Sequence, residues 1–359
     1  MHEFRRRLVE RIRNHGPLSV AEYMRAALQD PEFGYYRSGM RIGRNGDFIT
    51  SPEISQVFGE LLGLSLAQSW AAHGRPRPIG LVELGPGPGS LLADMLRATR
   101  LVEGFHGAFR KNLYLVESNE DFRRSQASLL GAYEPEWIDR IDDMPELPMY
   151  LIANEFLDCL PVHVFRKSAG GWQEKQVTEC RGRLTFAYGA SDASIDLTDF
   201  LVRPDDLRVG SIVEISPQTR VLALTIGKRI GRFGGTAIII DYGGWGTDGF
   251  TLQAVRRHRK CSPLAYPGSA DLTAHVDFRA VSRAAGAHAR VSGMIEQGEL
   301  LRNLGIAERM HVLAENLSGS SLQVHLAAHR RLTLPIEMGS TFKGISIVPD
   351  GAMFAPGFG

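Results

Sequence analysis

A short glycine-rich segment, GPGPG at 85–89, carries the clearest chemical signal in the sequence. It follows the apolar run 79–84 and precedes a helical pattern at 91–97, so it lies at the strand-to-helix turn where nucleotides approach the backbone. Its G-x-G-x-G spacing differs from the G-x-G-x-x-G of dinucleotide-binding folds. Pro86 and Pro88 also remove two backbone N–H donors, which makes the loop a poor phosphate cradle. The loop therefore favours a nucleoside ligand without phosphate, such as S-adenosylmethionine.

Acidic residues accompany the ends of the neighbouring apolar runs. Glu83 lies inside the first run, Glu117 ends the second, and Asp139 follows a short run further along. Because the carboxyl ends of parallel strands meet at one edge of a sheet, we expect these side chains to share a site. Glu117 would accept hydrogen bonds from the ribose hydroxyls, Glu83 would face the amino group or the sulfonium, and Asp139 would accept from the adenine amine. The alternative is a glycine loop that only forms a turn.

The elements that must position these residues alternate between buried runs and helical patterns. Four short apolar runs predict fully buried parallel strands: 79–84, 112–117, 149–155 and 236–243. Apolar residues recur at helical spacing over 54–72 and 91–97. This alternation predicts an α/β, doubly wound sheet, which 342–350 completes with one last strand.

The remaining segments differ from this core. Helices are expected at 4–12 and at 19–28, where Ser19 and Glu22 have the spacing of a capping box, and a glycine-interrupted loop follows. Alternating patterns between paired turn residues predict an inserted antiparallel cap. The expected units are listed in chain order: an N-terminal helical and lid segment at 1–75, the first part of the core at 76–160, a β-rich cap at 161–215, and the second part of the core with C-terminal elements at 216–359.

Composition excludes several classes of protein. The 359 residues are 43% hydrophobic and 23% charged, as in ordinary globular proteins, and 41 Lys and Arg against 40 Asp and Glu give no field that would hold nucleic acid. The longest apolar stretches are too interrupted to insert into a membrane. Three separated cysteines predict neither disulfides nor a metal cluster. We expect a cytoplasmic protein, with an arginine-rich transit peptide at the start as the alternative.

Several longer motifs resemble one family. They are ELGPGPGSLLADML, LVESNEDFRRSQ, ANEFLDCLPVHVF, VEISP, IIIDYG, GTDGFTLQAVRRHR, PGSADLTAHVDF and QGELLRNLGI. With them the chain resembles, over essentially its whole length, the MidA-like S-adenosylmethionine-dependent methyltransferases, which include a mitochondrial complex I assembly factor. The resemblance implies a class I, Rossmann-like methyltransferase fold, S-adenosylmethionine as cofactor and S-adenosylhomocysteine as product. It also implies symmetric dimethylation of an arginine on a protein partner, which in the mitochondrial member is a quinone-side subunit of complex I.

The resemblance assigns roles to individual residues. The cofactor signature falls on Glu83, Gly85, Gly87, Gly89 and the ribose-binding Glu117. Asn154 and Glu155 follow another strand, at the rim where ligands of open α/β sheets bind. An N-terminal lid over the cofactor would use the following residues: Tyr35, Tyr36, Asp47, Thr50 and Ser51.

Methyl transfer to a guanidinium requires carboxylates that hold the cation and leave one nitrogen nucleophilic. Glu155, Asp158 and Glu214 are the candidates, because each is expected beside a strand end that faces the cleft. Asp241, with Tyr242 beside it, could line the same rim or could be a turn residue.

Two further groups of residues have candidate roles with a structural alternative. His275 with Asp277 could remove the substrate proton, although a structural histidine is the alternative, and Cys261 with His275 lacks a third partner for a metal site. The basic run 256–260 is expected on a solvated helix face, with attraction of an acidic partner as the alternative.

The favoured function is therefore protein-arginine methylation that supports complex I assembly, with no metal and with the oligomeric state left open. Three alternatives remain: a methyltransferase for another side chain or a small molecule, a non-catalytic assembly factor that binds S-adenosylmethionine, and, disfavoured by the loop spacing, an NAD-dependent oxidoreductase.

Overall fold

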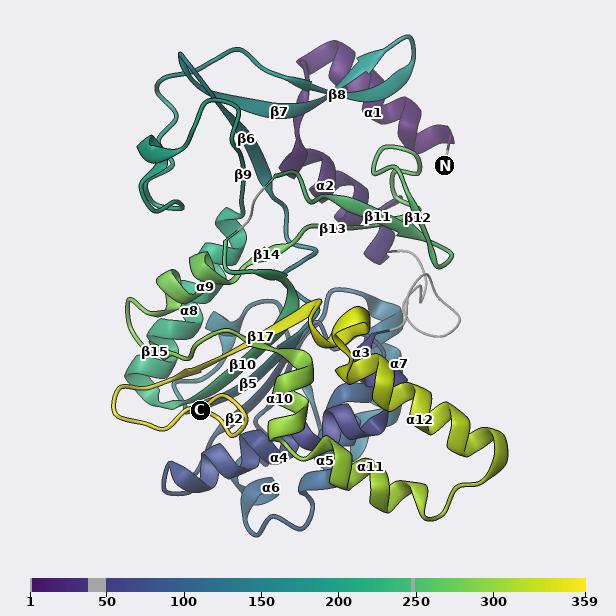
Figure 1. Cartoon of the computed structure of the whole chain (residues 1–359), viewed down its shortest axis with the longest axis vertical. Coiled ribbons are helices and arrows are strands. Elements are labelled where there is room, and N and C mark those ends of the chain that lie inside the picture. The colour runs from purple at the N-terminus through teal and green to yellow at the C-terminus, as the bar shows by residue number, and fades with distance from the viewer. Residues whose placement is uncertain (1, 38–49, 247–248) are drawn as a thin grey trace.

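A mixed sheet forms the centre of the molecule (Figure 1). The computed structural model describes residues 2–37, 50–246 and 249–359. The strands of this sheet are β2 (Gly80–Leu84), β3 (Leu113–Val116), β4 (Glu136–Ile138), β5 (Met149–Asn154), β10 (Gly235–Gly244), β14 (Val276–Asp277), β15 (Arg290–Val291), β16 (Ile295–Glu296) and β17 (Phe342–Val348). Their order is β15-β17-β10-β5-β2-β3-β4, with β14 paired to β10 and β16 to β17.

The strand predictions for this sheet are confirmed. β3, β2, β5 and β10 are parallel neighbours, and β17 pairs with β10 in the antiparallel direction. All residues of β2 and β5 are buried, which explains why their sequences are continuous apolar runs instead of alternating ones.

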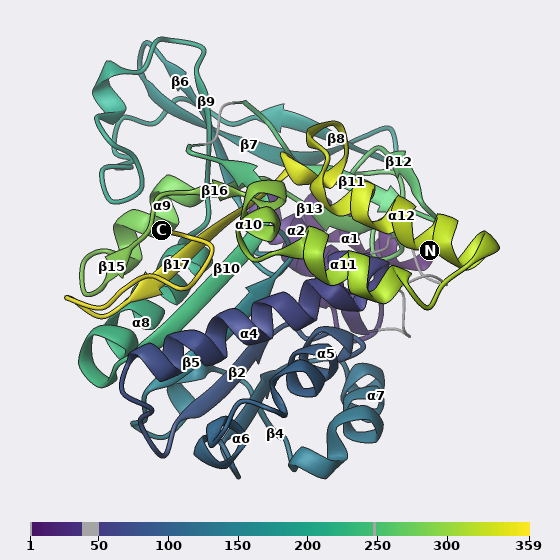
Figure 2. The same ribbon diagram turned by 60° about the horizontal axis from the view of Figure 1, so that its bottom comes forward.

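Helices cover both faces of the sheet. They are α4 (Gln56–Ala72), α5 (Ser90–Thr99), α6 (Phe105–Ala108), α7 (Glu120–Leu130), α8 (Pro217–Phe233), α9 (Phe278–Ala285), α10 (Gln297–Asn303), α11 (Ile306–Ala314) and α12 (Gly319–Thr333). Successive residues of β10 face opposite sides: Ile240 packs with α4, α5 and α10, whereas Ile239 packs with α8 and α9. Figure 2 shows α4 crossing one face with α5 beside it. The sheet is therefore doubly wound, as predicted.

A second layer, which we call the cap layer, stands on the carboxyl ends of the parallel strands (Figure 1). It contains α1 (His2–His15), α2 (Val20–Gln29), a five-stranded sheet and a three-stranded sheet. The larger sheet consists of β1 (Leu18–Ser19), β6 (His163–Ser168), β7 (Gly171–Cys180), β8 (Arg183–Tyr188) and β9 (Ile212–Ile215), all paired antiparallel. The smaller sheet consists of β11 (Gln253–Arg256), β12 (Arg259–Cys261) and β13 (Asp271–Thr273). The predicted antiparallel cap is confirmed.

The cap layer is built from three parts of the chain. These parts belong to three separate units in the division expected from the sequence. Its core joins Met24 of α2, Val164 of β6 and Leu272 of β13. The expected capping box of α2 is present: the Ser19 hydroxyl accepts from the Glu22 amide at 3.1 Å, and the Glu22 carboxylate accepts from the Ser19 amide at 2.8 Å. N-terminal helices and inserted strands thus form one body.

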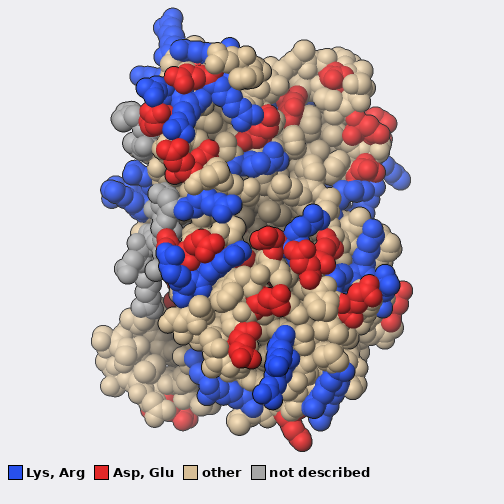
Figure 3. All heavy atoms as spheres, turned by 180° about the vertical axis from the view of Figure 1, so that it is seen from behind, with Lys and Arg blue, Asp and Glu red and all other residues tan. Residues whose placement is uncertain are grey.

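The basic run at 256–260 is not on a helix, so that expectation is wrong. It forms the hairpin between β11 and β12, where Arg257 and His258 occupy the left-handed region with φ of 51° and 59°. Two successive positive φ angles fit the two-residue turn of a tight hairpin. On the face seen in Figure 3, Lys and Arg are interspersed with Asp and Glu. None of the described helices has both the length and the hydropathy that crossing a bilayer requires.

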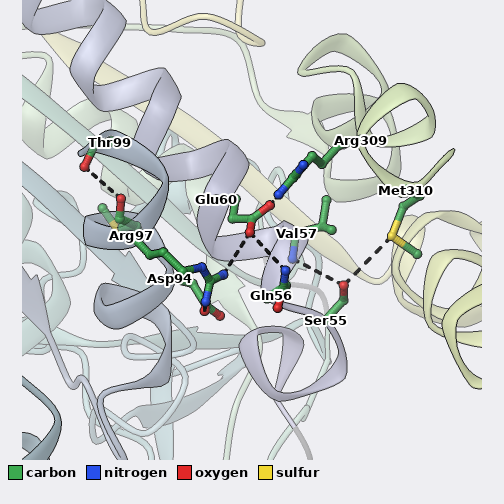
Figure 4. Close-up of polar contacts among 10 residues, drawn as sticks. Ser55, Gln56, Val57, Glu60, Asp94, Arg97, Thr99, Arg309 and Met310 are labelled. Carbon is green, nitrogen blue, oxygen red and sulfur yellow. Dashed lines mark hydrogen bonds and ion pairs between the residues drawn. The ribbon is translucent and has the colours of Figure 1, made fainter. Parts of the chain in front are cut away.

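A buried ion cluster joins the C-terminal helices to the sheet layer (Figure 4). Glu60 of α4 is 3% exposed and accepts from Arg309 of α11 at 2.6 Å, from Arg97 of α5 at 2.8 Å and from Gln56 at 3.1 Å. Burial opposes ionisation of Glu60, but the two guanidinium groups outweigh it and lower the pKa. Three helices are therefore held by one carboxylate.

We expect Glu60→Gln to lower the free energy of unfolding by about 1 to 2 kcal/mol at neutral pH, because it weakens charged hydrogen bonds to two guanidinium groups that are themselves partly solvated. A lowered native pKa contributes stability above the ordinary pKa of 4.5, and this contribution is lost as the pH falls through the native value. The difference from wild type should therefore shrink in acid. Urea unfolding measures it, with the exposed Glu103→Gln as control; equal midpoints for wild type and Glu60→Gln at neutral pH would contradict the cluster's role.

Candidate functional site

A cavity of about 320 Å³ lies between the two layers, at the carboxyl ends of β2, β3 and β5. The sheet layer contributes the glycine loop and the segments after β3 and β5, and the cap layer contributes the turn Tyr35–Arg37 and Asp271 of β13. The start of α3 (Ser51–Ile54) closes another side. This volume is in the range of small-molecule sites.

Most of the predicted site residues line this one cavity: Tyr36, Thr50, Glu83, Gly85, Gly87, Glu117, Asp139, Asn154, Glu155 and Asp158. Ser51 is fully buried behind the wall, Gly89 is the N-cap of α5, and Tyr35 packs edge-on against Tyr36. Asp47 lies outside the described residues.

The glycine loop adopts a backbone conformation that side chains would disturb. Gly85 has a φ of 62°, and a Cβ there would come within 2.6 Å of the Phe156 ring. Gly87 has a φ of 52°, and a Cβ there would meet no atom within 4 Å. Since Gly87 lines the cavity, an added side chain would take up space at the mouth of the ligand site.

Two carboxyl groups lie beside this loop: Glu83, which is buried, and Glu117, which is partly buried. Glu83 is 2% exposed, and its Oε2 atom has no hydrogen-bond partner among the described residues. Burial raises the pKa of Glu83 to about 8, and the neighbouring Glu117 adds to the shift. Glu117 accepts backbone N–H groups of Asn119, Ser118 and Gly87, but burial still raises its pKa. A cationic ligand without phosphate fits this pair of acids, and S-adenosylmethionine carries an ammonium and a sulfonium.

Asp139 has a different environment. Its side chain is 90% exposed and lies 3.6 Å from the Arg123 guanidinium, at the edge of the cavity. It borders the site without being enclosed by it.

The segment after β5 forms another wall of the cavity. Glu155 has a φ of 52°, a strained conformation for a residue with a side chain. Its carboxylate accepts from the Ser51 amide and from the Asn154 side chain, each at 3.2 Å, while the Asn154 Oδ1 atom has no partner among the described residues. Burial raises the pKa of Glu155 to about 7 in spite of these two donors.

Asp158 is 6% exposed and faces the same cavity. Burial raises its pKa well above the usual range, Asp241 and Asp271 add to the shift, and a hydrogen bond from Tyr242 opposes it. Of the two roles expected for Asp241, the structure supports the turn residue. Asp241 is fully buried and accepts the amides of Phe156, Leu157 and Asp158 at 2.8 to 3.2 Å. Asp241 therefore shapes the wall and does not line the cavity.

Asp271 lines the cavity but is absent from the predicted site residues. It accepts a hydrogen bond from the Tyr36 hydroxyl at 2.8 Å, which holds the expected lid tyrosine beside the cavity wall that Glu155 and Asp158 line. The only signal in the sequence is an acid within the PGSADLTAHVDF motif. Its contact with the site depends on how β13 packs above the sheet.

Glu214 and His275 do not face this cavity, so that expectation is wrong. They line a second cavity of about 220 Å³ between β9, α8 and α9. Glu214 accepts both the amide and the hydroxyl of Thr251, and that hydroxyl accepts the His275 amide at 2.9 Å. The reason is that β9 pairs with β6 in the cap sheet instead of joining the central sheet.

The expected hydrogen-bonded pair of His275 and Asp277, which would act as a base, is also not formed. The Asp277 carboxylate accepts the Ala280 amide at 3.0 Å and caps α9, and burial lowers the pKa of His275. Cys261 lies on β12 and packs in the core of the cap layer. No group of three side chains that could hold a metal occurs in the described parts of the chain.

Binding of S-adenosylhomocysteine should weaken as the pH falls below about 8. Glu83 is mostly protonated below that value, so the ligand's ammonium must displace a proton, which costs about tenfold in affinity per pH unit. Calorimetric titration at several pH values measures the slope, and Glu83→Gln should flatten it. An affinity that is independent of pH in the wild type would show that Glu83 does not meet the ammonium.

Gly87→Ala should reduce affinity for S-adenosylhomocysteine at least about tenfold, because the methyl group strains a positive φ and enters the cavity. Gly182→Ala is the matched control, since Gly182 also has a positive φ of 79° with open space around it but lies in the β7–β8 turn. Equal loss in both variants would mean that strain alone is responsible.

Comparison with known proteins places this geometry in a family. Residues 61–295 match the family described as "Putative S-adenosyl-L-methionine-dependent methyltransferase". A Danio rerio protein named "Protein arginine methyltransferase NDUFAF7, mitochondrial" is 36% identical over 95% of this chain and 86% of its own length. The Homo sapiens protein of that name is 35% identical over 96% of this chain and 83% of its own length. A crystal structure of a Burkholderia thailandensis protein bound to S-adenosyl-homocysteine has a TM-score of 0.81 at 28% identity and covers 99% of this chain and 94% of that one.

One expectation is contradicted here: the relatives are named as mitochondrial proteins, which overturns the cytoplasmic assignment. The cofactor expectation is confirmed by the family and by the ligand of the Burkholderia structure. The chain belongs to this family and is an S-adenosylmethionine-dependent methyltransferase with a class I fold.

Proposed function

We propose that the chain methylates the guanidinium group of an arginine in a protein substrate. The observation that carries this proposal is a set of three carboxyl groups on one wall of the cofactor cavity, which we call the acidic wall: Asp158 and Asp271, which are buried, and Glu155, which is partly buried. Relatives named protein arginine methyltransferases support the same acceptor. Symmetric dimethylation, and a role in assembling respiratory complex I through a quinone-side subunit, follow from the family resemblance and are part of the proposal.

The acidic wall suits a permanent cation. Burial raises the pKa of Glu155 and of Asp158, and nearby carboxyl groups raise both further. These groups cannot all ionise without a positive partner, and a guanidinium stays charged at any physiological pH. Its planar set of donors also matches carboxylates in a bidentate arrangement. The negative charge of the acidic wall would therefore hold and orient an arginine side chain, and the arginine would neutralise that charge.

The reaction needs positioning and one proton acceptor. When the cofactor is bound, it supplies the methyl group, and S-adenosylhomocysteine leaves as the product. The guanidinium nitrogen that gains the methyl group loses a proton. In our proposal the Glu155 carboxylate accepts that proton, since a pKa of about 7 suits a base that works near neutral pH. Asp158 and Asp271 would hold the two nitrogens that do not react.

Glu155→Gln and Asp271→Asn should reduce methyl transfer at least about a hundredfold while S-adenosylhomocysteine still binds, because each removes a charge from the acceptor wall. The assay uses S-adenosylmethionine with a labelled methyl group, purified quinone-side complex I subunits, and acid hydrolysis to identify the methylated amino acid. Glu214→Gln is the matched control, since Glu214 is a buried acid of the second cavity.

The proposal predicts label in dimethylarginine, lost in both wall variants and retained in the control. Label in another amino acid, or transfer only to small molecules, would contradict the acceptor. Unchanged function of Glu155→Gln in complex I assembly would favour a non-catalytic, cofactor-binding factor.

A further inference from the structure

The QGELLRNLGI motif begins with a glutamine that the cofactor site leaves unexplained. Gln297, the first residue of α10, is fully buried. Its side-chain nitrogen donates to the Leu332 carbonyl of α12 at 3.0 Å, and its Oε1 atom accepts the Ser51 hydroxyl at 3.2 Å. Because a carbonyl accepts at one end and a hydroxyl donates at the other, only one orientation of the amide satisfies both contacts.

Ser51 continues this chain of contacts to the cavity. Its backbone N–H donates to Glu155 Oε1 at 3.2 Å, while its hydroxyl is held by Gln297. Ser51 is fully buried at the start of α3, so no water competes for either contact. The series Leu332, Gln297, Ser51 and Glu155 therefore links a C-terminal helix to the acidic wall.

The far end of this series is closely packed. A Cβ at Gly298 of α10, or at Gly339, would collide with the backbone carbonyl of Thr333, the last residue of α12. Glycine at these two positions lets α10 and the segment after α12 approach backbone to backbone. Gln297 therefore lies next to a closely packed junction.

We propose that Gln297 is a positioning residue that holds Glu155 in place through Ser51. This rests on the proposed function, in which Glu155 faces the reacting groups. Gln297 makes no contact with the cavity and acts only through the serine at the start of α3.

Several charged groups surround Glu155 besides these donors. Asp271 lies on β13, Asp158 and Asp241 lie in and behind the same wall, and Arg331 comes from α12. Burial is the largest influence on the pKa of Glu155 and raises it, and Asp271 raises it further. The Ser51 amide, Asn154 and Arg331 lower it. Weakening the Ser51 contact should therefore raise the pKa above about 7.

The charge on Glu155 can be read without a methyl acceptor. S-adenosylmethionine and S-adenosylhomocysteine differ by the methyl group and the positive charge on sulfur, so the ratio of their dissociation constants reports negative charge near that sulfur. Groups that meet the ammonium, including Glu83, affect both ligands and cancel in the ratio. In the wild type the preference for the charged ligand should grow about tenfold as Glu155 ionises.

The test titrates both ligands by calorimetry from about one unit below to about one unit above the pKa of about 7. Gln297→Met keeps a similar volume and removes both amide contacts. Ser51→Ala removes only the hydroxyl link and keeps the amide, so it covers the case in which Gln297→Met fails to fold. Asn303→Ala, on the exposed side of α10, is the control.

We expect the midpoint of the ratio to move to higher pH in Gln297→Met, to move less in Ser51→Ala, and to stay in place in Asn303→Ala. A folded Gln297→Met or Ser51→Ala protein with the wild-type midpoint would overturn the positioning role. A wild-type ratio that does not depend on pH, matched by Glu155→Gln, would instead remove Glu155 from the reacting groups and refute that part of the proposed function along with the positioning role.

Discussion

The burial of several acidic side chains at one edge of the sheet is the constraint on which the rest of the structure depends. Glu83, Asp158 and Asp241 are each at most 6% exposed, and Glu155 borders the same wall. A buried charge without a partner is costly, so such groups must either hold protons or be compensated. Asp241 accepts four backbone amides and Glu155 accepts one backbone amide and the Asn154 side chain, whereas Glu83 Oε2 has no hydrogen-bond partner among the described residues. The site is therefore built to bind positive charge.

The two layers divide this task. The doubly wound sheet brings Glu83, Glu117 and Glu155 to a single edge, because the parallel strands that carry or precede them end there. The cap layer covers that edge and adds Asp271 and Tyr36. The ion cluster at Glu60 holds α11 against α4, and α12 accepts the Gln297 contact behind Glu155. Removal from water strengthens each interaction at the edge.

The sequence predicts the sheet and the glycine loop well, because both depend on local patterns. Fully buried strands require continuous apolar runs, and a loop that approaches a ligand requires glycine at positions such as Gly85 and Gly87. The sequence does not predict which sheet a strand joins. Glu214 follows an apolar run as Glu155 does, but β9 pairs in the cap, so its carboxylate belongs to a different cavity. Asp271 and Gln297 could not be found either, since their roles arise only when distant segments pack together.

Binding of arginine by the acidic wall is tested most directly by changing the charge of the acceptor itself. Protein saturated with S-adenosylhomocysteine would be titrated with an arginine-containing peptide from a quinone-side complex I subunit, and with the same peptide carrying citrulline, which has nearly the same shape and no charge. We expect the arginine peptide to bind at least about a hundredfold more tightly, because only a cation compensates the acidic wall. Equal affinities would contradict recognition of a cation, since the carboxyl groups of the acidic wall would then have a purely structural role.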